Sequence, residues 1–156
     1  MSTLCKVPIY RLKLVKDRVM RVTASSLTDS FTAARLVERL IRDADRETLV
    51  TVCMDAECQV LGINVVAMGT LVSVSTTGRE IFKGAIAANA HSIILGHNHP
   101  SGDLEPSQAD IRMTRQAVLI GSMLTIPVLD HVIVSRLGYT SMRQRGIVPS
   151  PGRTAA

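Results

Sequence analysis

The most restrictive feature of this sequence is a pattern that occurs three times: a segment with helical periodicity is followed by a short apolar run typical of a buried strand. The helices are expected over about 30–43, 78–89 and 107–120, and the strands that follow them over 48–54, 92–96 and 130–135. Further strands are expected within Val60–Val74, as one long or two short strands, and over Val7–Val15, where apolar and basic residues alternate. Alternating helices and strands predict an α/β or α+β fold with a mixed β-sheet flanked by helices.

The length and composition are those of one globular domain. With 156 residues, the chain can bury a proper core without disulfide or metal staples. We expect this domain over residues 1–147, with 1–21 as a basic N-terminal strand or arm and 148–156 as a frayed C-terminal tail. The hydrophobic share of 46% excludes disorder for most of the chain, and no apolar run is long enough for a membrane helix. The three cysteines lack metal-binding spacing and no secretory signal is visible, so we expect free thiols in the cytoplasm.

The net charge of +5 is concentrated in the first 21 residues. This segment holds six basic residues against Asp17, whereas acidic and basic residues balance in the rest of the chain. We interpret the segment as an exposed strand face or a partner-binding patch, with a weak, non-specific nucleic-acid contact as the alternative. With only 2 Tyr, 2 Phe and no Trp, the composition argues against a base-stacking platform. We also expect that the chain can form a homodimer.

The segment from His97 to Asp110 carries the chemistry. His97 and His99 leave a strand two residues apart, so both side chains project to the same face. Asp110 lies at the third position of the following helix, where its side chain points back toward the histidines. Two imidazoles and one carboxylate make a three-ligand zinc site with a fourth position open to water, as in catalytic zinc sites. The alternatives are a surface histidine pair and a plain capping box of Ser107 with Asp110, although Asp110 could serve as both cap and ligand.

The same segment resembles the JAMM motif of the JAB/MPN metalloproteases, in which His-x-His is followed by Pro and Ser precedes Asp by three residues. The run His97–Asp103 resembles the RadC branch of this family closely, as does Leu129–Val134. The resemblance covers about residues 30–147 and implies a JAB/MPN-like, cytidine-deaminase-like single domain. Two features depart from the family: Thr77-Gly78 stands where relatives usually carry His-Pro, and we expect no room in these 156 residues for the N-terminal helix-hairpin-helix segment of the longer relatives. The second departure weakens a DNA-binding interpretation.

The resemblance implies a function and a set of roles. His97, His99 and Asp110 would hold one zinc ion per chain, and Ser107 would help to position the substrate carbonyl oxygen as negative charge develops on it. An upstream glutamate would take a proton from the attacking water and pass it to the leaving amine. The reaction would be the hydrolysis of a peptide or isopeptide bond in an unidentified protein or peptide substrate. The alternative is a non-catalytic MPN-like interaction module or an accessory protein of DNA repair or DNA metabolism.

Four glutamates are candidates for the general acid/base. Glu57 is expected in a turn, Glu105 lies in the metal loop itself, and Glu80 is explained by a capping box with Thr77. Glu47 immediately precedes the apolar strand 48–54, where a carboxylate can overhang a site at a neighbouring strand end. Glu47 also stands where RadC-like sequences carry the JAMM glutamate, so we predict Glu47 as the general acid/base, with Glu80 as the alternative.

The pair Asp130-His131 begins a predicted strand and has two interpretations. The pair could orient a metal ligand, or it could be a satisfied pair within the core. We favour the core interpretation.

Overall fold

The computed structural model describes residues 6–22, 26–69 and 77–149. Helices and strands alternate along the chain in the order α1 (Ser30–Ile41), β1 (Thr48–Met54), β2 (Val60–Met68), α2 (Gly78–Ala87), β3 (Ser92–Asn98), α3 (Gln108–Met123), β4 (Val128–Ser135) and β5 (Gly138–Ser141). None of the described helices is long and apolar enough to cross a membrane.

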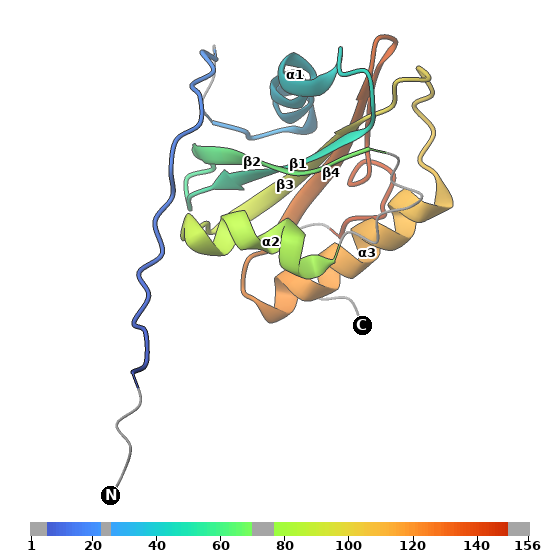
Figure 1. The fold of residues 1–156 in the computed structure, drawn as a ribbon. Coiled ribbons are helices and arrows are strands. Elements are labelled where there is room, and N and C mark those ends of the chain that lie inside the picture. The colour runs from blue at the N-terminus through green and yellow to red at the C-terminus, as the bar shows by residue number, and fades with distance from the viewer. Residues whose placement is uncertain (1–5, 23–25, 70–76, 150–156) are drawn as a thin grey trace, which may run out of the picture.

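The five strands form one mixed sheet with helices on both faces. The strand order is β2-β1-β3-β4-β5, in which β3 and β4 are parallel and the other neighbours antiparallel. Helix α1 packs on one face, and α2 and α3 cover the other (Figure 1). β1 and β3 are buried along their whole length, as expected of central strands between two helical layers. The predicted architecture, a mixed sheet flanked by helices, is therefore confirmed.

Two of the three predicted helices begin with a side-chain cap. The Asp29 side chain accepts a hydrogen bond from the Thr32 N–H at the start of α1, and Ser107 caps α3. At the start of α2, by contrast, Thr77 makes no side-chain cap bond, and Glu80 instead forms an ion pair with Lys83. The predicted capping box at α2 is therefore wrong.

Both ends of the chain differ from the prediction. Residues 6–22 run as an extended segment without strand pairing, so the strand predicted over Val7–Val15 is wrong for the single chain (Figure 1). β5 was not predicted, because four residues beginning with glycine give little strand signal. In the predicted frayed tail, Val148 is buried against Ile133 and Met142, and residues 150–156 lie outside the described part.

Candidate metal centre

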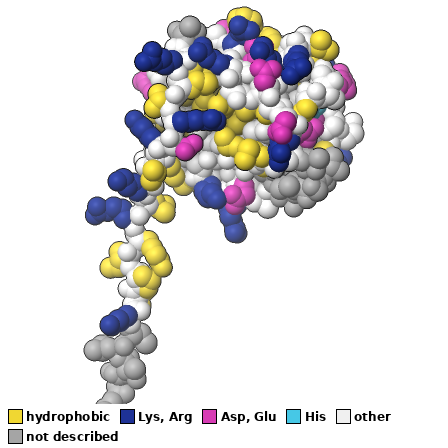
Figure 2. Space-filling model, turned by 45° about the horizontal axis from the view of Figure 1, so that its top comes forward, with side chains coloured by type: hydrophobic (Ala, Val, Ile, Leu, Met, Phe, Trp, Pro, Cys, Tyr) yellow, Lys and Arg dark blue, Asp and Glu magenta, His cyan; other side chains and the backbone are white. Residues whose placement is uncertain are grey.

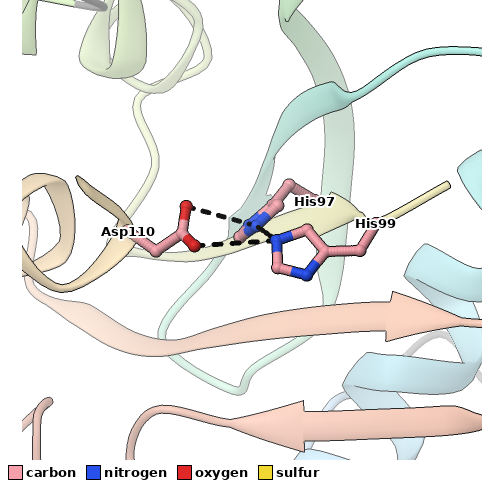
Figure 3. Close-up of side chains that lie close together, drawn as sticks. All are labelled: His97, His99 and Asp110. Carbon is pink, nitrogen blue, oxygen red and sulfur yellow. Dashed lines mark hydrogen bonds and ion pairs between the residues drawn. The ribbon is translucent and has the colours of Figure 1, made fainter. Parts of the chain in front are cut away.

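The end of β3 and the start of α3 bring two histidines and an aspartate together. His97 lies in β3 and His99 follows the strand at once, so both rings point to the face covered by α3. Asp110 lies in the first turn of α3. Its N–H donates to the Ser107 hydroxyl and its carboxylate accepts from the Ser107 N–H, so the predicted capping box is present here. Figure 3 shows the three side chains pointing at one another.

The distances between the donor atoms fit a single small cation. His97 Nε2 lies 2.9 Å from His99 Nε2 and 3.4 Å from Asp110 Oδ1, and His99 Nε2 lies 3.6 Å from Asp110 Oδ2. Ligand atoms about 2.0–2.1 Å from a tetrahedral zinc ion lie roughly 3.3–3.5 Å apart, so the two histidine–aspartate distances are close to this spacing, whereas the two ring nitrogens lie closer together. One donor atom from each residue lies within 4.8 Å of the other two. His97, His99 and Asp110 could therefore provide three ligands for one ion.

A backbone carbonyl fixes the hydrogen on the His99 ring. His99 Nδ1 lies 2.8 Å from the carbonyl oxygen of Asp103. A carbonyl oxygen only accepts, so Nδ1 carries the hydrogen and Nε2 of the neutral ring presents a lone pair to the cluster. The Asp103 carboxylate accepts from the Glu105 N–H instead. The backbone carbonyl of Asp103 thus orients the His99 ring.

A second carbonyl fixes the hydrogen on His97 through two intermediate groups. The Thr114 hydroxyl donates to the Asp110 carbonyl oxygen at 2.6 Å, which leaves its oxygen to accept from His131 Nδ1 at 2.6 Å. His131 Nε2 then accepts from His97 Nδ1 at 2.8 Å. His97 Nε2 is left with a lone pair that faces the one on His99.

This arrangement gathers donor atoms that could hold a metal ion. Two nitrogen lone pairs 2.9 Å apart are stabilised by a positive charge next to both, which either a metal ion or a proton on His99 supplies, and contact with Asp110 raises the pKa of His99. Burial lowers the pKa of His97 well below its ordinary value and that of His131 to about 4, so both rings are neutral at pH 7. Burial acts to raise the pKa of Asp110, but contacts with His99, His97 and Ser107 outweigh it and keep the carboxylate ionised. Neutral imidazoles and a carboxylate are the donors that zinc requires, so the residues present fit this metal.

The side chains of Asp130 and His131 do not pair with each other, although the His131 N–H donates to Asp130 Oδ1. His131 contacts His97 on one face of the sheet, whereas the Asp130 carboxylate accepts from Ser30, Ser141 and the Arg143 N–H on the other. Successive strand residues point to opposite faces, which separates the two side chains. Asp130 therefore matches the core interpretation, whereas His131 occupies the orienting position beside a candidate ligand.

The start of β1 places Glu47 on the side of the sheet that carries the histidines. Leu49 pairs with His97 across β1 and β3 and lies in the core under α2 and α3, and Glu47 has the same strand parity as Leu49. Contact with Asp110 is the main cause that raises the pKa of His99, and the charge of Glu47 adds a smaller contribution. The predicted general acid/base is thus within electrostatic reach of a candidate ligand.

The Asn98 side chain fixes the backbone on both sides of Glu47. Asn98 is fully buried, its Oδ1 accepts from the Thr48 N–H at 2.8 Å, and its Nδ2 donates to the Arg46 carbonyl at 3.2 Å. The Glu47 carbonyl itself accepts from the Gly69 N–H. Sequence reasoning missed Asn98 and Thr114, because neither is a metal ligand or a titratable group and their roles depend on contacts between distant segments.

The other candidate glutamates have different surroundings. Glu80 pairs with Lys83 on α2, and Glu105 makes a two-pronged ion pair with Arg145 at 2.6 and 2.8 Å. Glu57 lies in the β1–β2 turn, where its N–H donates to an aspartate side chain. Within the described residues, Glu47 is the glutamate whose charge acts on His99.

Ser107 is exposed and lies directly beside the candidate ligands. Its hydroxyl donates to Asp110 Oδ2 at 2.6 Å and accepts from the Asp110 N–H at 3.1 Å. The hydroxyl is therefore engaged in the cap, while its side chain stays accessible to a bound molecule.

Comparisons with known proteins give a matching family and several similar proteins. A family model described as the RadC-like JAB domain matches residues 27–147. A "UPF0758 protein" of Moorella thermoacetica is 43% identical over 130 residues, which are 76% of this chain and 57% of the relative. Proteins of the same name from Chloroflexus aggregans (48% identical, 66% of this chain and 45% of the relative) and Roseiflexus castenholzii (42%, 89% and 58%) are also similar. The chain spans about half the length of the curated relatives it matches.

Proposed function

Because the chain belongs to the RadC-like JAB domain family, we propose that it is a zinc-dependent hydrolase that cleaves a peptide or isopeptide bond. His97, His99 and Asp110 would hold one zinc ion per chain. The observation that supports this most strongly is the pair of ring nitrogens held 2.9 Å apart, each with its hydrogen fixed on the far side by a carbonyl-anchored bond. Two facing ring nitrogens next to a carboxylate favour a positive charge, and these are the donor atoms that a zinc ion would take.

Each residue of the centre then has a proposed role. Bound zinc would lower the pKa of a water molecule to about 7 and polarise the carbonyl group of the scissile bond. Glu47 would accept a proton from the attacking water and deliver it to the leaving nitrogen. The Ser107 hydroxyl would turn from Asp110 to the substrate oxygen as negative charge develops there. Asn98 would keep Glu47 in position by its two backbone bonds.

Metal analysis of two aspartate variants tests the ligand set. We expect about one zinc per wild-type chain and none in Asp110→Ala, because that change removes a ligand. Asp103→Ala is the matched control: it removes a neighbouring carboxylate but leaves the carbonyl that orients His99. Equal zinc loss in both variants would contradict the assignment of Asp110 as the carboxylate ligand.

A trapping experiment tests the chemistry and the role of Glu47. Glu47→Gln should keep zinc and the fold, retain bound substrate proteins, and fail to cleave those that the wild type cleaves. Glu80→Gln, the control, should cleave them at the wild-type rate. Normal turnover in Glu47→Gln together with a dead Glu80→Gln would transfer the general acid/base role to Glu80.

The exposed basic residues of the segment 6–22 support a second candidate function, weak and non-specific nucleic-acid binding. Such binding should fall steeply with salt and disappear when residues 1–21 are removed. Binding that survives both treatments would instead favour a DNA-metabolism accessory protein.

A further inference from the structure

The segment 6–22, which we call the arm, exposes apolar side chains that a single chain does not cover. Ile9 is 99% exposed and Tyr10 and Leu12 are each 85% exposed. Figure 2 shows the arm standing off the domain with apolar and basic side chains along it. In an extended backbone, Tyr10, Leu12 and Leu14 lie on one face and the intervening basic residues on the other. This is the pattern of a strand with one buried face, present without its sheet.

The domain carries an edge that such a strand could join. β2 is the outer strand of the sheet, and along its length it pairs with β1 alone among the described elements. Ile63 and Val65 lie opposite Val52 and Val50, on the face of β2 that carries α1. Helix α1 packs over β3 and β4, and Val65 and the bulge residue Leu61 are 43% and 49% exposed. An unpaired edge beside exposed apolar residues is a site for strand addition.

Residues 7–15 cannot pair with the β2 edge of their own chain in a ladder that continues from the neighbouring bridge. Ser26 forms an isolated antiparallel bridge with Gln59, just before β2. A ladder continued from this bridge would set Val22 opposite Ile63 and Asp17 opposite Met68, so residues 7–15 would lie beyond the end of β2. In the structure, moreover, the chain leaves the edge: Val22 lines a surface hollow beside α1.

We propose that residues 7–15 of one copy add as a sixth strand to the β2 edge of a second copy, with the exchange reciprocal between the two chains. Tyr10, Leu12 and Leu14 then extend the apolar face of β2 that carries Ile63 and Val65, and the basic residues of the arm stay on the opposite face. Residues 6–22 can extend over roughly 55 Å, which exceeds the diameter of a domain of this size. The arm is therefore long enough to reach a neighbour.

Two features favour a second copy as the partner. The arm and the uncovered edge occur in the same chain and have matching apolar faces, so exchange covers both surfaces without another protein. Pairing of one arm with another arm is disfavoured, because residues 1–21 carry six basic side chains against one acidic. β2 carries no charged residue, so its edge presents no such repulsion.

Light scattering on the full chain tests the association. The wild type should have twice the chain mass of 16.9 kDa, and Leu12→Gln/Leu14→Gln should be monomeric. Arg11→Gln/Lys13→Gln, which places the same residues on the opposite face, should remain dimeric. A monomeric wild type, or equal dissociation of both variants, would overturn the proposal. Zinc content should be wild-type in all of these proteins, so this test is independent of the proposed hydrolase activity.

Disulfide trapping tests the pairing itself. In a Cys5→Ser/Cys58→Ser background, one chain carries a single arm cysteine, introduced at Tyr10, Leu12 or Leu14 in turn, and another chain carries Val65→Cys. Oxidation of the mixture should give a cross-linked heterodimer with at least one of the three arm positions. A chain carrying both cysteines that cross-links only internally would show that the arm folds back on its own domain and would refute the exchange.

Discussion

At the residue scale, Thr114 fixes the hydrogen on the His97 ring although it does not contact that ring. Its hydroxyl links the Asp110 carbonyl to His131, which in turn fixes the hydrogen on His97. Thr114→Val keeps the shape but removes this link, so His97 loses its fixed tautomer. We expect zinc affinity to fall by about 10–100-fold, as for other changes behind metal ligands, with the fold retained. Isothermal titration with zinc measures the change.

Thr51→Val is the matched control for that experiment. The Thr51 hydroxyl is also buried and donates to a backbone carbonyl, that of Ile81. Its loss should cost about 1–3 kcal/mol of folding free energy, as at Thr114, but leave zinc affinity unchanged. If both variants bound zinc equally weakly, the effect would be one of general stability and not of the hydrogen-bond chain.

The sequence was sufficient to identify His97, His99 and Asp110 as neighbours, because strand and helix periodicities fix where such side chains point. It was insufficient for His131, whose role depends on a parallel pairing of β3 with β4. Leu95 lies opposite His131 in that pairing, which sets the second ring beside His97. Such registers arise from contacts between distant segments, and local patterns do not encode them.

At the scale of elements, the packing of α1 on the sheet depends on the absence of a side chain at Gly96. A Cβ added there would lie 2.6 Å from both methyl groups of Val37 on α1. Gly96→Ala should therefore push α1 from β3 and destabilise the fold by roughly 1–3 kcal/mol in chemical denaturation. Gly62→Ala on β2, where no atom lies within 4 Å, should change stability by less than about 1 kcal/mol. Similar losses at the two positions would show that strand glycines matter for their backbone and not for this contact.

The elements that were predicted well are those whose pattern is local. The buried runs of β1 and β3 and the amphipathic α1 are visible in short windows of sequence. The arm has an equally clear alternation, yet it pairs with no strand in the single chain, because alternation indicates a face and not a partner. Thr77 shows the opposite failure: the residue types of a capping box are present, but the cap bond is not formed.

At the scale of the whole molecule, metal binding and folding should be linked. The candidate ligands come from β3 and α3, so a shared ion ties two elements together. With free zinc at a hundred times its dissociation constant, the folded state should gain about 2.7 kcal/mol. Chelation should then lower the melting temperature by roughly 5–10 °C for a chain of this size. Asp110→Ala should show no response to zinc or chelator, whereas Asp103→Ala should respond like the wild type.

The opposite directions of Asp130 and His131 restrict insertions and deletions in β4. Asp130 holds α1 and β5 on one face, through Ser30 and Ser141, while His131 supports the candidate metal centre on the other. Removing or adding one residue before this pair in the strand would exchange the two faces, placing a carboxylate behind His97 and an imidazole among the serines. Shortening β4 by one residue should therefore damage both faces of the molecule at once, which most single substitutions in the strand would not do.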